Sequence, residues 1–445
     1  MSAQRAPFRP AADGQNTPRA LAVMGVGLVI DQHPGYALWA EIERAGGGRV
    51  ALPAPAGSLR QCREQAALFR AAAWRSALTH RPADGGALEE FVESYPLPTV
   101  VAVPSTSRHA DDLAGWVNAY GAELRRALRN GAGMAFHDIN RIDRTWAATD
   151  NDFLWSHAFR LFDQSGDLNS LMLWAEEGYA IRTELGSWRN GRGEPLASML
   201  AREKAPGDWS DSFAALLLGY GKAAEWLMEL APYVCDASRV TQFANGVKGR
   251  TAHCFGGLQF ELARHPTAGA ATAHVPAPWT RAQMAQYDQM PVLAWMHRPH
   301  VADYLDDGKK PLPAQAQVEC LAAAIDAAMK AGPVGHVPQR ILYDPGAGEG
   351  MARRKAVLIQ AVQAALPACD LFDPRVGYDL RERLGDTGAA SAVASLGLAS
   401  MAAWETKAAV MVIAARRDGG ACVALVTPTR AAYRDQFTRP PYEPA

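Results

Sequence analysis

Several features that would assign the chain to a special class of protein are absent from its sequence. The six cysteines form no CxxC pair and lie far apart, at Cys62, Cys235, Cys254, Cys320, Cys369 and Cys422. In a chain of this size, such spacing indicates reduced thiols rather than a disulfide framework or a zinc site. The first apolar run, residues 21–30, is too short to span a membrane, and residues 1–18 lack the apolar core of a signal peptide. We therefore expect a cytoplasmic protein with no membrane partner.

An excess of charge is also absent, since the 445 residues carry a formal net charge of -1. This balance argues against a nucleic-acid-binding surface spread over the whole protein. With 49% hydrophobic and 20% charged residues, the composition is that of an ordinary soluble globular protein. The length allows two or three domains.

Recognisable catalytic motifs are missing as well. No serine lies in a Gly-x-Ser-x-Gly elbow, which argues against a lipase of the α/β-hydrolase type. The glycine-rich segment 346–350 has no Walker lysine, so a plain tight turn is favoured over a phosphate site at a helix start. His137 and Asp138 follow a predicted strand, but no nucleophile accompanies them.

Two further histidines, His297 and His300, are separated by Pro299 and have no other ligand type at metal-binding spacing. A structural or surface pair is therefore favoured over a metal site, which needs three or four ligands. We predict no catalytic, cofactor-binding or metal-binding residues.

The first 137 residues alternate between strand-like and helix-like segments. Strands are predicted at 20–30, 98–103 and 133–137, and helices at 34–44, from 61 onwards and at 113–128. This alternation is typical of an α/β layer with parallel strands. Gly25 and Gly27 lack the third glycine of a dinucleotide fingerprint, so we expect them to permit close packing instead.

Residues 138–300 have a different character, with clustered tryptophans and few clear strands. A strongly apolar helix is predicted at 211–230, and residues 186–194 form a predicted loop rich in glycine and arginine. We interpret the segment as a mainly helical, tryptophan-rich insertion. Three of its tryptophans are expected in the core: Trp155, Trp174 and Trp226.

The alternation resumes in the last third of the chain. The predicted elements are helices at 318–330 and 351–366, a strand at 339–344, and a hairpin of strands 408–415 and 421–427. The proline-rich tail from residue 428 is expected to lie loosely on the surface. The predicted segments are a disordered tail (1–18), an N-terminal α/β half (19–137), the insertion (138–300), a C-terminal α/β half (301–430) and a tail (431–445).

A helix of small residues organises the C-terminal half. It follows Gly385-Asp386-Thr387-Gly388, where Asp386 and Thr387 are both suited to cap the amides of the first turn. Residues 389–403 leave no strongly polar face, which indicates a helix buried on all sides. Two interpretations remain open: a core helix, or a helix whose N-terminus presents its positive dipole to a site.

The order of these elements resembles the C-terminal half of thiolase-like enzymes, the β-ketoacyl synthases in particular. The resemblance covers residues 19–137 and 310–430 and implies a thiolase-like layered α/β core. The two positions that would hold catalytic histidines carry Asp344 and Asp386, and no cysteine lies in a nucleophile motif. An aspartate is anionic at neutral pH and cannot polarise a thioester as a donor, so the resemblance implies an inactive enzyme.

A second resemblance spans most of the chain. Residues 21–30 with Trp39, the stretch 278–299 (PWTRAQMAQYDQMPVLAWMHRP) and residues 378–391 are similar to the adapter proteins of type VI secretion lipase effectors. This resemblance implies a cytoplasmic, non-catalytic protein. It would bind a phospholipase effector and help to load it onto the spike protein of the secretion system.

The insertion is where we expect the partner to bind. Tryptophan and arginine are enriched in binding hot spots, and loops often carry binding residues. Trp188, Arg189 and Arg192 combine both features and are the predicted partner-binding residues. Two alternatives to the adapter remain: a protein that binds acyl-thioesters or acyl carriers, and a subunit that dimerises through the edge of a thiolase-type sheet.

Overall fold

A computed structural model describes residues 19–31, 33–50, 59–80, 89–90, 99–102, 142–146, 154–164, 170–179, 181–182, 209–219 and 289–443. Four predicted segments lie outside these residues: the tail at 1–18, the helix at 113–128, the strand at 133–137 and the loop at 186–194.

Most of the described strands belong to one sheet of 12 strands. Its order is β12-β11-β13-β14-β9-β1-β8-β7-β5-β6, with β10 paired to β14 and β2 paired to β1. The strands are β1 (Ala20–Ile30), β2 (His33–Pro34), β5 (Thr99–Ala102), β6 (Ile142–Trp146), β7 (Ser170–Glu177), β8 (Ser212–Gly219), β9 (Ala294–His297), β10 (His300–Asp303), β11 (Pro338–Asp344), β12 (Gly377–Asp379), β13 (Ala409–Arg417) and β14 (Gly420–Pro428). A separate pair is formed by β3 (Thr79–His80) and β4 (Glu89–Glu90). β9 joins the two halves of the large sheet because it pairs with β1 on one side and β14 on the other.

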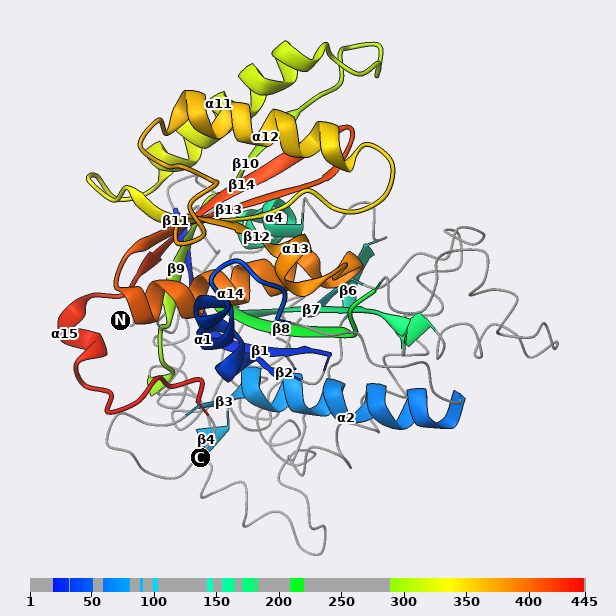
Figure 1. Cartoon of the computed structure of the whole chain (residues 1–445). Coiled ribbons are helices and arrows are strands. Elements are labelled where there is room, and N and C mark those ends of the chain that lie inside the picture. Colours follow the sequence, from blue (N-terminus) through cyan, green and yellow to red (C-terminus); the bar gives the residue numbers. More distant parts are fainter. Residues whose placement is uncertain are drawn as a thin grey trace, which may run out of the picture.

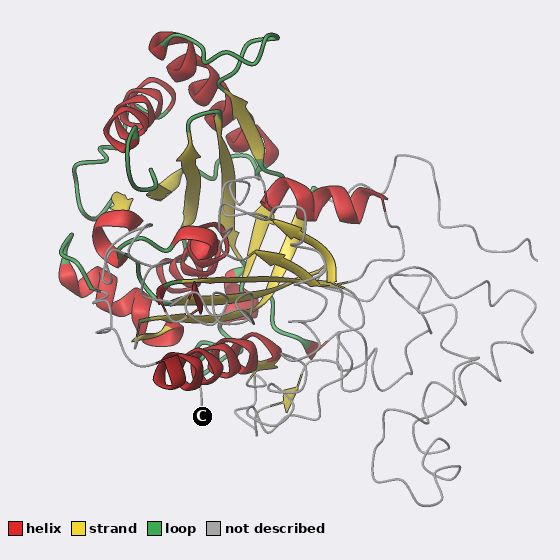
Figure 2. Cartoon of the chain, turned by 90° about the vertical axis from the view of Figure 1, so that its right-hand side faces the viewer, coloured by secondary structure: helices red, strands yellow, loops and turns green. Residues whose placement is uncertain are grey.

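Helices cover the strands and also lie between them. They are α1 (Gly35–Ala45), α2 (Leu59–Leu78), α4 (Leu154–Gln164), α11 (Ala314–Ala331), α12 (Met351–Ala365), α13 (Leu380–Leu384), α14 (Ser391–Thr406) and α15 (Ala431–Arg434). In Figure 1 the layers run from α11 and α12 at the top, through β13 and β14, to α14, then to β1, β7 and β8, and finally to α2. Figure 2 shows the same layers from the side. The α/β class predicted from the sequence is confirmed. Across the described part of the chain, no helix combines the length and the apolar character that crossing a membrane requires.

The central helix of the core is α14, as its small residues predicted. Its residues from 391 to 404 are all buried. It contacts β1 and β8 in one half of the sheet, β13 and β14 in the other half, and β9, which joins the two halves. Small side chains permit this approach on both sides, since a Cβ atom on Gly397 would lie 3.1 Å from the side chain of Val26.

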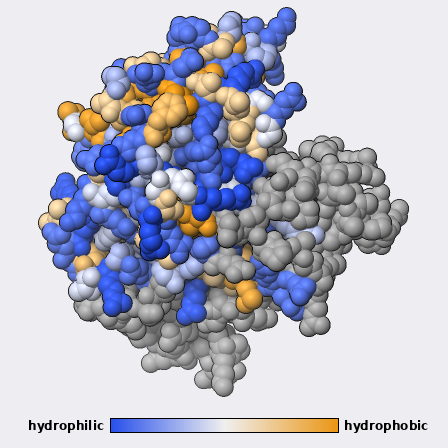
Figure 3. Space-filling view, viewed as in Figure 1, coloured by the Kyte–Doolittle hydropathy of each residue, from blue (hydrophilic) through white to orange (hydrophobic). Residues whose placement is uncertain are grey.

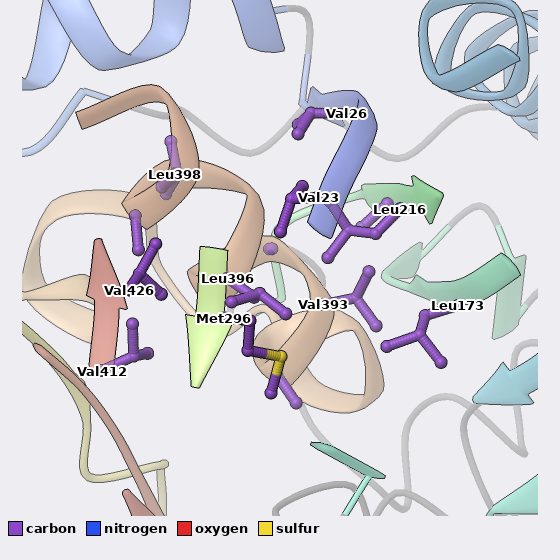
Figure 4. Packing of buried hydrophobic residues seen from close by; sticks show 14 of the residues in the cluster. Val23, Val26, Leu173, Leu216, Met296, Val393, Leu396, Leu398, Val412 and Val426 are labelled. Atoms are coloured by element: carbon purple, nitrogen blue, oxygen red, sulfur yellow. The ribbon is translucent and has the colours of Figure 1, made fainter. Parts of the chain in front are cut away.

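The core packing around α14 is visible in Figure 4. Val393 lies on the side of Leu173 and Leu216, which belong to β7 and β8. Leu398 lies on the side of Val426 from β14. All five side chains belong to one hydrophobic cluster, so α14 links the two halves of the sheet through a single core.

Two glycines of β1 allow α2 to lie directly against the strand. A Cβ atom on Gly25 would lie 1.9 Å from the carbonyl oxygen of Ala77, and one on Gly27 would lie 1.7 Å from that of Ala73. Neither position has room for a side chain. The predicted role of these glycines in close packing is confirmed.

The direction of the strands was predicted only in part. β5 runs parallel to β6 and β7, and β11 runs parallel to β12 and β13. β1, however, runs antiparallel to β8 and β9, so the prediction of parallel strands is wrong for this strand. The cause is that a fully apolar run indicates burial on both faces but carries no signal for direction.

The predicted helix at 211–230 is wrong where the chain is described. Residues Ser212–Gly219 form β8, and all eight are buried between β1 and β7. A short apolar run fits a buried strand as well as a buried helix. Trp155 and Trp174 are buried in the core as predicted, whereas Trp226 lies outside the described residues. The division of the chain at 137 and 300 stays a prediction.

The tail from residue 428 does not lie loosely on the surface. Tyr442 is 6% exposed and its hydroxyl donates to Oε1 of Glu405, at 2.8 Å. The ring of Phe437 packs edge-on against Trp404, with 5.6 Å between ring centroids. The composition of the tail predicted a loose segment, but its aromatic side chains dock on the end of α14.

Candidate functional site

The candidate site lies where the chain turns from α13 into α14. Gly385 has a φ of 83°, and a Cβ atom there would lie 2.4 Å from Oγ of Ser210. Gly388 has a φ of 42° and begins a short 3-10 turn, Gly388–Ala390, which leads into α14. At both positions a positive φ and a close neighbouring atom exclude a side chain. This explains why a glycine stands at each end of the turn.

Arg416, from the end of β13, lies between two aspartates. Its Nη1 is 2.7 Å from Oδ2 of Asp344, and its Nη2 is 2.7 Å from Oδ1 of Asp386. Asp344 is the last residue of β11, and its Oδ2 also accepts a hydrogen bond from the hydroxyl of Ser391. The site thus brings together the two aspartates that the sequence analysis singled out, with an arginine that it missed.

Both carboxylates are also held by the backbone. Oδ1 of Asp344 accepts from the amide of Gly346 at 2.7 Å, and Oδ1 of Asp386 accepts from the amide of Gly388 at 3.1 Å. The aspartates are 1% and 2% exposed, so these contacts replace their hydration almost completely.

The charge of Arg416 is well stabilised. Burial by itself would lower the pKa of its guanidinium, but the charges of Asp344 and Asp386 and the hydrogen bonds to them raise it, and the net direction is upward. The group is therefore a permanent cation with 13% of its side chain exposed. Its two terminal nitrogens each donate to one carboxylate oxygen, Oδ2 of Asp344 and Oδ1 of Asp386.

The cap at the start of α14 differs from the prediction. Oδ1 of Asp386 accepts from the amide of Gly388 in the 3-10 turn that leads into α14, whereas Thr387 makes no side-chain capping bond. Oε2 of Glu177, at the end of β7, also accepts from this turn, from the amide of Ala389 at 3.0 Å. Two carboxylates thus meet the positive end of the helix, and one of them comes from a strand far away in the sequence.

Glu177 is 0% exposed, and Arg182 neutralises it. The guanidinium donates from Nε to Oε1 at 2.7 Å and from Nη2 to Oε2 at 3.0 Å. Arg182 also lies over the ring of Trp209, 4.4 Å from the ring centroid. Sequence reasoning missed this group, although two glutamates at the end of an otherwise apolar strand were the available signal.

A further carboxyl group, Asp31, lies at the end of β1. Its Oδ1 accepts from the amide of Asp211 at 2.9 Å, and its Oδ2 is buried without a hydrogen-bond partner. Burial raises the pKa of Asp31 to about 7, with the charge of Asp211 acting in the same direction and that of Arg49 opposing it.

The glycine turn before α12 holds an arginine of its own chain rather than an open concavity. Arg354 donates to the carbonyl oxygens of Pro345, Ala347 and Glu349 at 2.8, 3.0 and 3.3 Å. Carbonyl oxygens, not amides, thus converge on the inside of the turn. This arrangement supports the plain turn over the phosphate site.

The two histidines lie on successive strands of the chain, β9 and β10, which both pair with β14. His297 is buried in β9, with Nε2 2.9 Å from Oγ1 of Thr427, and burial lowers its pKa to about 4. His300 begins β10 and is half-buried. No group of three His, Cys, Asp or Glu residues lies together among the described parts of the chain.

The predicted partner-binding residues Trp188, Arg189 and Arg192 lie outside the described residues, as do His137 and Asp138. That Trp188, Arg189 and Arg192 bind a partner stays a prediction.

Comparison with protein families supplies the decisive observation. A model of the N-terminal part of a family described as "Type VI lipase adapter protein Tla3" matches residues 19–193, and a model of its C-terminal part matches residues 293–428. The two matches together cover more than half of the chain. The chain belongs to this family of type VI lipase adapters. The second resemblance seen in the sequence is confirmed. The C-terminal match includes all three members of the Asp344–Arg416–Asp386 cluster.

Solved structures similar to this chain include ketosynthases. The ishigamide ketosynthase/chain length factor is 16% identical, with 92% of this chain and 100% of that chain covered at a TM-score of 0.48. The ketosynthase from module 1 of the bacillaene synthase of Bacillus amyloliquefaciens FZB42 is 12% identical, with 94% and 77% covered at a TM-score of 0.44. The sequence resembles the same group of enzymes in the order of its elements.

Proposed function

We propose that the protein is a non-catalytic cytoplasmic adapter that binds a phospholipase effector and assists its loading onto the type VI secretion spike. The match of both family models along the chain carries this proposal. The family description supplies the adapter role and the lipase class. The phospholipase, the spike protein and the cytoplasmic location are our extension of it.

The chemistry at the start of α14 supports a role without catalysis. Polarising a thioester requires donors aimed at its oxygen, and Asp344 and Asp386 are acceptors engaged by Arg416. The sequence also offers no recognisable nucleophile motif. An adapter needs neither donors that polarise a thioester nor a nucleophile.

We further propose that the partner binds the segment 186–194, a predicted loop that contains Trp188, Arg189 and Arg192. Its support is compositional, because a tryptophan and two arginines in a glycine-rich loop combine the residues most enriched in hot spots. A surface that carries such side chains suits a protein partner better than a small ligand.

The adapter proposal is tested by a pull-down of the tagged protein from its native bacterium, followed by mass spectrometry. We expect a phospholipase and a secretion spike protein among the proteins recovered. Purified protein should leave phospholipids and short acyl esters intact. Turnover that persists after removal of contaminating esterases, or repeated recovery of no lipase, would contradict the proposal.

The partner surface is tested with Trp188→Ala and Arg192→Ala in co-purification with the effector. Phe372→Ser is the matched control, because Phe372 is 76% exposed on another loop and is not part of the predicted surface. We expect loss of binding in the first two variants only. Normal binding by both folded variants would place the partner surface elsewhere.

The alternative function is binding of acyl-thioesters or acyl carriers without turnover. It is favoured by one observation, the gathering of Asp344, Asp386 and Ser391 at one helix end. Titration of the purified protein with an acyl-thioester distinguishes the two functions. Saturable binding would support the alternative, and its absence would leave the adapter.

A further inference from the structure

Arg416 joins three elements that come from distant parts of the C-terminal half. The residue lies near the end of β13, and its guanidinium reaches Asp344 at the end of β11 and Asp386 before α14, at 2.7 Å each. The sequence separations are 72 and 30 residues, so no local pattern brings these groups together. The contacts are made by a planar, forked group that presents a separate nitrogen to each carboxylate.

The two aspartates share this cation. Each accepts one backbone amide, from Gly346 or Gly388, but an amide carries no full charge. Without the guanidinium, each of the two buried carboxylates would lose a charged partner at 2.7 Å. Removing one partner of a buried ion pair is strongly destabilising, because the other charge remains buried.

A second ion pair in the C-terminal half, between Arg353 and Asp418, is exposed to solvent instead of buried. Arg353 contacts Asp418 at 3.0 Å, but the two side chains are 49% and 58% exposed. Exposed pairs contribute little, since water screens them in the folded state. Arg353 is therefore a matched control for Arg416: the same residue type, in contact with the same half of the fold, but in solvent.

We propose that Arg416 is an internal strap that closes the site at the start of α14. It fixes the end of β13 against the turn Gly385–Gly388, and it occupies the space between the two carboxylates. Any outside ligand reaches these carboxylates only after the guanidinium has moved away. This inference rests on the contacts of Arg416 and stands whether or not the protein binds a lipase.

The test compares Arg416→Ala, Arg416→Lys and the control Arg353→Ala in the full-length protein. We expect a clearly lower Tm for Arg416→Ala and almost no change for Arg353→Ala. Hydrogen exchange should accelerate at the amides of Gly346 and Gly388 in the Arg416 variants, while amides inside β14 keep their protection. Arg416→Lys keeps the charge but not the fork, so it should fold and still lose protection at one or both amides.

Chemical rescue gives a second, independent readout. Low millimolar guanidinium chloride should raise the Tm of Arg416→Ala and restore amide protection, whereas ammonium chloride and sodium chloride should not. The wild-type protein should show no such rise, because its own guanidinium fills the site. Unchanged exchange at both amides in Arg416→Lys would overturn the proposal, and so would equal effects of the three salts on a folded Arg416→Ala.

Discussion

At the scale of single residues, buried carboxylates gather at the start of α14, and each is paired with an arginine. Asp344 and Asp386 share Arg416, and Glu177 is paired with Arg182. Burial of a charge is tolerated only when it is paired and hydrogen-bonded, and these three carboxylates meet that condition. The same pairing removes them from reaction with a ligand.

Replacing Asp386 with asparagine tests what this residue contributes. Asparagine keeps an oxygen for the amide of Gly388 and for Arg416 but loses the charge, so we expect a loss of about 1–2 kcal/mol in the free energy of unfolding. Urea denaturation measures this loss, and effector binding should remain normal. A changed affinity for an acyl-thioester with unchanged stability would instead favour the acyl-binding alternative.

Asp31 should make stability depend on pH. In the folded protein its pKa is about 7, whereas the ordinary pKa of an aspartate is 3.8. Folding therefore favours the protonated form of Asp31. The stabilisation is fully present below about pH 4 and is lost as pH rises to about 7, by at most roughly 4 kcal/mol.

Asp31→Asn cannot ionise and should remove this dependence, so the variant gains stability relative to wild type between pH 5 and 8, as measured by denaturation at several pH values. Asp326→Asn, on the exposed face of α11, controls for general loss of negative charge. A parallel pH profile for Asp31→Asn and wild type would show that another group titrates.

At the scale of elements, contacts between backbones set the spacing of β1 and α2. The glycines of the strand lie under carbonyl groups of the helix, where side chains of any size would separate the two elements. At both positions the nearest atoms belong to the backbone of α2 and cannot rotate away, and position 27 is slightly the tighter, at 1.7 Å against 1.9 Å.

Gly27→Ala should therefore be strongly destabilising. Its Cβ atom would lie 1.7 Å from the carbonyl oxygen of Ala73, and relieving that overlap requires α2 to shift. We expect a loss of about 3 kcal/mol or more in the free energy of unfolding. Gly419→Ala is the control, since its Cβ atom would make only an ordinary contact at 3.5 Å with Leu305. Similar losses in both variants would contradict this account.

At the scale of the whole molecule, the C-terminal segment closes the core beside α14. The hydroxyl of Tyr433 accepts from the amide of Val292, at 3.1 Å, and Tyr442 bonds to Glu405. The segment thus contacts both the start of β9 and the end of α14.

A chain that ends at residue 430 should be less stable by at least about 3 kcal/mol, because the aromatic side chains of the tail lose their buried contacts. Tyr442→Phe isolates the polar part and should cost about 1–2 kcal/mol, the order expected for a hydrogen bond to a charged group. Thermal melts of both variants check the ranking. A truncated chain as stable as wild type would show that the tail only rests on the surface.

On the face seen in Figure 3 the described surface is mainly hydrophilic, and hydrophobic residues gather on its upper part, where α11 and α12 lie. Val334, Val337 and Phe372 follow these helices and are strongly exposed, at 104%, 59% and 76%. Exposed hydrophobic side chains could themselves bind a protein, so Phe372→Ser tests this region as well as serving as the control for the predicted partner surface. If that variant alone loses the effector, the binding face lies at this end.

The sequence by itself determined the elements that depend on local patterns. The apolar run of β1, the small-residue helix α14 and the hairpin of β13 and β14 were predicted within a few residues, because composition and periodicity encode burial directly. It also indicated the two aspartates, by their place in a known order of elements, and the adapter family, by similarity spread along the chain.

Only the tertiary structure decided which strands are neighbours and which charges are partners. The sequence could not show that residues 212–219 form a strand between β1 and β7, since an apolar run fits strand and helix alike. It could not assign Arg416 to Asp344 and Asp386, or Glu177 to the amide of Ala389, 212 residues away. Burial is a property of a segment, but an ion pair depends on where the folded chain brings two distant segments together.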